Sequence, residues 1–121
     1  MITRITIKSE PADRSYKDRL TITRSSVRYE NEPLVPGGKA VPQKWTVSSD
    51  SPAFAKMFGN LCEEVQTILA MEEGNGTTQT TFTIMHDDGN KEERTLRQAD
   101  EVYTVCFTIV DQMVRCAGGR Q

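Results

Sequence analysis

Cysteine, histidine and long apolar runs are all scarce in this chain, and each scarcity argues against a class of protein. The three cysteines are an odd number, and no two of them form a CxxC pair, so we expect neither a disulfide framework nor a structural zinc site. The longest apolar stretch, residues 102–110, contains two threonines and is less than half as long as a membrane span. No apolar block follows the first residues, so we expect no signal peptide and predict a cytoplasmic protein.

Motifs of catalysis are scarce as well. The single histidine, His86, precedes Asp87 and Asp88, and an imidazole beside two carboxylates can act as a base or a metal ligand. An enzyme centred on His86 is therefore one hypothesis. Neighbouring residues of an extended chain point in alternating directions, however, and Asp-Asp-Gly-Asn at 87–90 is typical of a hairpin turn. Because no GxSxG, HExxH, Walker or Rossmann pattern occurs either, we predict a non-enzymatic protein with no catalytic residue, metal site or cofactor.

Length and composition indicate a single domain. The chain has 121 residues and a mass of 13.6 kDa, and 36% of its residues are hydrophobic, which allows one modest core. We predict one domain over residues 1–121, in which residues 116–121 form a frayed C-terminal tail.

Two amphipathic helices are predicted. The first begins at Ser51 and Pro52, an N-cap followed by a proline at the first helical position, and ends at Gly74. The second begins near Asp100 and ends at Gly118. Its apolar residues form two adjacent stripes, which indicates burial on two sides, against the sheet and against the other helix or a partner chain. We therefore expect a homo-oligomer or a protein partner.

Alternating and β-branched patterns predict five strands, over residues 2–8, 20–30, 43–47, 78–86 and 91–97. Polar loops are expected over 9–18 and 31–42. Within the second strand, Leu20 and Ile22 have one parity whereas Val27 and Tyr29 have the other. A single strand cannot keep both pairs on one face, so we expect a bulge or kink at residues 24–26.

The element order ββ-β-α-ββ-α predicts the α+β class, an antiparallel sheet of about five strands with two helices packed on one face. Trp45 and Val47 share a parity, and we expect both to point inward. The uncovered face would display Arg4, Thr6, Lys8, Thr21 and Thr23.

A weak internal repeat accompanies this order. A shift of 49 residues places Ser51 on Asp100 and Phe54 on Tyr103, so a helix start and an apolar stripe coincide. This coincidence suggests a duplicated ββα unit.

Charge is unevenly distributed along the chain. Residues 1–48 hold nine Lys and Arg against five Asp and Glu, whereas residues 49–121 hold six against twelve. Basic residues with aromatics on a sheet surface are one way to bind single-stranded nucleic acid, although a pI of 5.4 argues against it. The leading prediction is a small, self-associating, non-enzymatic binding or interaction module. The alternative is nucleic-acid binding by residues 1–48, with contacts from Arg4, Lys8, Arg24, Arg28, Tyr29 and Lys44.

Overall fold

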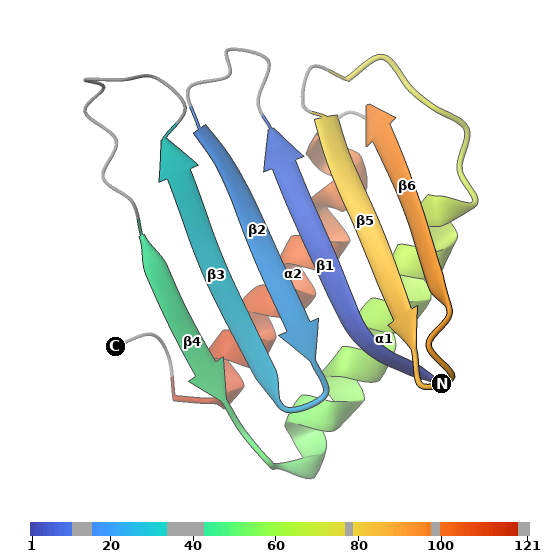
Figure 1. Ribbon diagram of the computed structural model, residues 1–121. Coiled ribbons are helices and arrows are strands. Elements are labelled where there is room, and N and C mark those ends of the chain that lie inside the picture. Colours follow the sequence, from blue (N-terminus) through green and yellow to red (C-terminus); the bar gives the residue numbers. More distant parts are fainter. Residues whose placement is uncertain (11–15, 34–42, 77–78, 98–99, 119–121) are drawn as a thin grey trace.

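The protein is an α+β domain with one antiparallel sheet and two helices, as predicted (Figure 1). The computed structural model describes residues 1–10, 16–33, 43–76, 79–97 and 100–118. The elements are β1 (Ile2–Glu10), β2 (Tyr16–Thr23), β3 (Ser26–Pro33), β4 (Lys44–Ser48), α1 (Pro52–Leu69), β5 (Gln79–His86), β6 (Lys91–Arg97) and α2 (Asp100–Cys116). The six strands have the order β4-β3-β2-β1-β5-β6. Both helices lie on the same face of the sheet, behind it in Figure 1.

The single strand expected over residues 20–30 is wrong, because the chain turns there and forms the two strands β2 and β3. Leu20 pairs with Tyr29 and Ile22 with Val27, so the change of parity marks a hairpin rather than a bulge. The turn is held by a 2.7 Å hydrogen bond between the Thr23 and Ser26 hydroxyls.

The two predicted polar loops, over 9–18 and 31–42, are partly strand in the structure. Residues 9–10 and 16–18 belong to strands, as do 31–33, whereas 11–15 and 34–42 lie outside the described residues.

Helix α1 forms as its sequence indicates. The Ser51 hydroxyl accepts a hydrogen bond of 3.2 Å from the backbone N–H of Phe54, which satisfies one of the free donors of the first turn. The helix ends at Leu69 rather than near Gly74. Its buried face consists of Phe54, Phe58, Leu61, Val65 and Ile68.

Helix α2 also forms, and Cys116 is its last residue rather than part of a tail. Residues 119–121 and the Asp100 side chain lie outside what the structure describes. None of the described helices is long and apolar enough to cross a membrane.

The core lies between the helices and the inward side chains of the strands. The Phe82 ring of β5 packs against the Tyr103 ring of α2, with centroids 5.5 Å apart. Trp45 and Val47 share the inner face, as predicted, and Trp45 stacks on Tyr29 with a centroid distance of 5.5 Å.

Two ββα units occupy equivalent places in the domain. Each has one edge strand, β4 or β6, paired with an inner strand, β3 or β5, and followed by a helix. Val47 and Leu96, which are 49 residues apart, are both buried on these edge strands. Phe58 and Phe107 differ, since Phe58 is 5% exposed and Phe107 is 39% exposed. The architecture therefore repeats, and duplication of the sequence stays a prediction.

Candidate functional site

The face of the sheet opposite the helices is uncovered by any described element, and we call it the open face. Cross-strand pairing aligns its outward side chains in rows, such as Arg28, Thr21 and Thr6 on β3, β2 and β1. The five residues expected on the uncovered face all belong to it. Its charged members are Arg4, Lys8, Glu10, Lys17, Arg19, Arg28, Glu30, Glu32, Lys44, Lys91, Glu93 and Arg97. Its uncharged members are Thr6, Thr21, Thr23, Ser26, Thr46, Ser48, Gln79, Thr81, Thr83, Met85 and Thr95.

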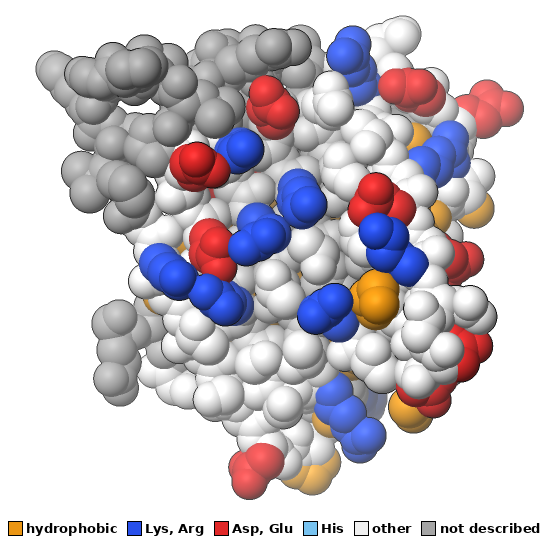
Figure 2. Space-filling model, viewed as in Figure 1, with side chains coloured by type: hydrophobic (Ala, Val, Ile, Leu, Met, Phe, Trp, Pro, Cys, Tyr) orange, Lys and Arg blue, Asp and Glu red, His pale blue; other side chains and the backbone are white. Residues whose placement is uncertain are grey.

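Cations dominate the centre of the open face, where Figure 2 shows Lys and Arg side chains spread over the strands. Arg4 and Lys8 lie on the central strand β1, and Lys44 lies on the edge strand β4. These three side chains form no direct ion pair with any described residue. Their charges are therefore available to an anionic ligand.

Two further arginines of the open face share one carboxylate. Glu30 accepts from Arg19 and from Arg28, each at 2.8 Å. Partial burial acts to raise the pKa of Glu30, but the hydrogen bond from Arg19 and the charges of Arg19, Arg28 and Lys44 outweigh it and lower the pKa. Glu30 therefore stays ionised at neutral pH and offsets part of the charge of both guanidinium groups.

Threonine hydroxyls fill the space between the cations. Thr6 is flanked in register by Thr21 on β2 and Thr83 on β5, and Thr81 hydrogen-bonds to Thr95 at 2.8 Å. A depression of about 490 Å³ lies at one end of the face. Its charged lining consists of the bases Lys8, Lys17 and Arg19 and the acids Glu10, Asp18, Glu30 and Glu32.

The structure brings together four of the six residues predicted to contact nucleic acid. Arg4, Lys8, Arg28 and Lys44 lie on the open face, whereas Arg24 lies in the turn between β2 and β3. Tyr29 points to the opposite, helix-covered side, where it stacks on Trp45. The prediction omitted Arg19 and Glu30 as site residues, because their pairing follows from the register of β2 with β3.

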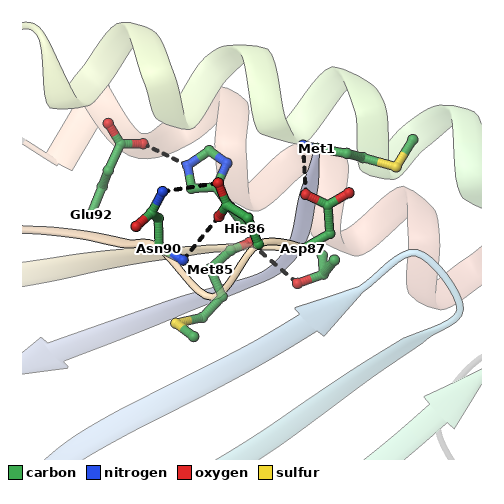
Figure 3. A network of polar contacts seen from close by, with 8 residues as sticks. Met1, Met85, His86, Asp87, Asn90 and Glu92 are labelled. Atoms are coloured by element: carbon green, nitrogen blue, oxygen red, sulfur yellow. Dashed lines mark hydrogen bonds and ion pairs between the residues drawn. The ribbon is translucent and has the colours of Figure 1, made fainter.

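His86 does not meet the two carboxylates that follow it. Its Nε2 lies 3.0 Å from a carboxylate oxygen of Glu92 on β6, as Figure 3 shows. Asp87 instead pairs with the amino group of Met1 at 3.1 Å, and Asp88 accepts from Asn90. Within the described part of the chain, no group of three or more His, Cys, Asp or Glu could hold a metal ion. The His86 ring therefore pairs with Glu92 and not with Asp87 or Asp88, and the absence of catalytic activity stays a prediction.

Two of the three cysteine thiols are buried away from solvent to a large extent, and the third is exposed. Burial raises the pKa of Cys62 to about 11 and that of Cys106 to about 12, so both stay protonated at neutral pH. Cys116 is exposed, with its sulfur 3.6 Å from the Ser51 hydroxyl. Since the thiolate is the nucleophilic form, Cys62 and Cys106 serve as small apolar side chains.

Helix α2 leaves little apolar surface uncovered. Of its apolar residues, Val105 is 49% and Phe107 is 39% exposed, whereas Tyr103, Cys106, Ile109, Val110, Met113 and Val114 are buried within this one chain. The second side expected to be buried on α2 thus consists mainly of the exposed Val105 and Phe107, with Val102 half-buried. Self-association stays a prediction.

A second depression, of about 430 Å³, runs beside α2 and is lined by Thr80, Tyr103 and Phe107 among others. Thr80 is 1% exposed, and its hydroxyl has no hydrogen-bond partner among the described residues. Val27 occupies the equivalent position of the other ββα unit, since Val27 pairs with Val47 as Thr80 pairs with Leu96.

Replacing Thr80 with valine is expected to stabilise the protein by about 1 kcal/mol, because it removes a buried, unpaired hydroxyl while keeping the shape. Thr83→Val is the matched control. Thr83 is also buried, but its hydroxyl donates to Glu93 at 2.9 Å, so its removal should destabilise the protein by roughly 0.5–1.5 kcal/mol. Urea denaturation measures both. Equal losses of stability in the two variants would contradict the role assigned to Thr80.

Comparison of the chain with protein-family models, with curated proteins and with solved structures finds no match.

Proposed function

We propose that the protein is a non-catalytic binding module that holds an anionic macromolecule against its open face. The observation that carries this proposal is a six-stranded sheet face that no described element covers and on which eight Lys and Arg face four Glu. Apart from the depression at one end, the face is uncovered over all six strands, which suits contact over an area better than enclosing a small molecule.

The distribution of charge over the two layers supports this proposal. The helix layer carries more acids than bases, with Glu63, Glu64, Glu101 and Asp111 against Lys56 and Arg115. The net charge of −2 and the pI of 5.4 of the whole chain therefore do not describe the charge of the open face.

The acidic layer does not cancel the field of the open face. A helix with its side chains is about 10 Å thick. The acids on the helices are therefore separated from the open face by the thickness of the helix and by that of the sheet. The Debye length is also about 10 Å at 0.1 M salt. An anion approaching the sheet consequently meets Arg4, Lys8 and Lys44 together with the neighbouring acids Glu30 and Glu93, while the acids behind the sheet are screened.

Charge reversal on the open face should abolish polyanion binding. We expect the wild-type protein to be retained on a heparin column at low salt, and Arg4→Glu/Lys8→Glu to flow through, because two unpaired cations become acids at the centre of the face. The matched control is Lys56→Glu/Arg115→Glu, which makes the same change in net charge on the helix layer and should elute with the wild type. Equal shifts in the two double variants, or no retention of the wild type, would contradict the proposal.

A further inference from the structure

We infer that the anionic partner is a nucleic-acid duplex, held by its sugar–phosphate backbone without reading its sequence. This inference rests on the proposed function and adds the chemistry of the partner. Three observations support it: the Arg, Lys and Thr side chains on the open face, the lack of aromatic side chains there among the described residues, and the width of the sheet.

The donors on the open face are those that bind phosphates. Arg, Lys and Thr side chains supply most protein contacts to the backbone of nucleic acids, and Arg4, Thr6 and Lys8 follow one another outward along β1. Arg4 and Lys8 are four residues apart, or about 14 Å along a strand. A duplex carries one charge for about every 1.7 Å of its axis, so the distance between Arg4 and Lys8 on β1 already spans several phosphates.

The width of the sheet excludes its insertion into the major groove of an undeformed duplex. Six strands spaced about 4.8 Å apart make a sheet about 24 Å wide, whereas the major groove is about 12 Å wide and admits a helix or a two-stranded ribbon. The central cations Arg4 and Lys8 are also flanked by strands on both sides. The face can therefore lie across the backbone ridges, but it does not bring these side chains to the base edges of an undeformed duplex.

The same composition disfavours an acidic protein as the partner. Protein interfaces concentrate aromatic residues and Met at their centre and are poor in Lys. On the open face, Met85 is the one described side chain of that kind, and it lies among cations and threonines.

Single-stranded nucleic acid is also disfavoured as the partner, because the open face lacks the side chains that bind it among the described residues. Single-stranded nucleic acid is held by stacking of its bases on aromatic rings. None of the described aromatic side chains lies on the open face, since Tyr29 and Trp45 stack on each other on the helix-covered side. A duplex keeps its bases stacked internally and needs no such platform.

Glu30 limits the affinity and supplies a variant that should increase it. Glu30 pairs with two arginines, and the remaining cations of the face other than Arg4, Lys8 and Lys44 are engaged in ion pairs or hydrogen bonds. The face therefore offers about three free cations, and three phosphate contacts predict a slope of about −3 when the logarithm of the association constant is plotted against that of the salt concentration. Glu30→Gln frees two guanidinium groups and should make the slope steeper by about 1 or 2.

The test is fluorescence anisotropy with the full chain and labelled DNA and RNA duplexes of two unrelated sequences, titrated over a series of low salt concentrations. We expect equal affinity for the two sequences and a slope of about −3. Arg4→Glu/Lys8→Glu should bind at least about tenfold more weakly and Glu30→Gln more tightly, while Lys56→Glu/Arg115→Glu should bind like the wild type. Circular dichroism melting verifies that each variant is folded.

Three outcomes would overturn the inference. The first is tighter binding of a single strand than of the duplex, and the second is a preference for one of the two sequences. The third is retention on heparin, or binding to polyglutamate, that Arg4→Glu/Lys8→Glu abolishes although no duplex binds. This third result would leave the proposed anion-binding function standing, whereas a wild-type protein that binds none of these polyanions would remove both.

Discussion

Phe82→Ala is expected to lower the free energy of unfolding by about 3–5 kcal/mol. Phe82 is fully buried on β5, one of the four inner strands of the sheet, and its ring packs on that of Tyr103 from α2 at 5.5 Å. Truncation loses the transfer free energy of the ring, leaves a cavity, and removes an aromatic pair that joins the sheet to the helix layer. The open face itself is not touched, because Phe82 points inward.

Urea denaturation followed by circular dichroism measures this loss. Phe107→Ala is the matched control, since it removes the same atoms from a ring of α2 that is 39% exposed, and its cost should be clearly smaller. Phe82→Leu retains most of the volume and should cost less than about 1.5 kcal/mol. Similar losses for Phe82→Ala and Phe107→Ala would mean that α2 does not pack on β5 as described.

The elements with a continuous apolar period could be predicted from the sequence. The spacing of Phe54, Phe58 and Leu61, together with the Ser51 cap, is sufficient for α1 because both are local properties of the chain. The hairpin between β2 and β3 was missed because its two turn residues are Arg24 and Ser25. Tight turns are usually marked by Gly, Asn or Asp, and neither turn residue is one of these. A change of parity alone fits a bulge as well as a hairpin, and strand pairing decides between them.

In the candidate site, too, local properties of the sequence could be predicted, whereas contacts that depend on strand pairing could not. Alternation along β1 and β2 is a local property of the chain, and it suffices to place Arg4, Lys8 and Thr21 on one face. The pairing of Glu30 with two arginines depends on the register across β2 and β3, which the expected single strand did not contain. Tyr29 was assigned to the nucleic-acid surface by its position in the chain, whereas its parity in β3 directs it to the core side.

The role of Arg94 in ending α1 also depends on tertiary structure. Arg94 belongs to the charged sequence of β6, which is an edge strand of the sheet. Arg94 nevertheless has the inward parity of Leu96, and its guanidinium donates to the backbone carbonyl of Leu69 at 2.6 Å. Leu69 is the last residue of α1, where carbonyls lack helical partners and the helix dipole favours a cation.

Arg94→Ala is therefore expected to destabilise the protein by about 1.5–3 kcal/mol, the range for a hydrogen bond to a charged group. The control is Arg97→Ala on the same strand, whose guanidinium has a long 3.4 Å contact with Gln79 at an exposed site and whose loss should change stability by no more than about 0.5 kcal/mol. Arg94→Lys should restore part of the loss, because an ammonium supplies the charge but not the planar donor geometry. Thermal and urea denaturation of the three variants distinguish these cases. If Arg94→Ala is as stable as Arg97→Ala, the end of α1 does not depend on the bond from β6, and the capping role of Arg94 is wrong.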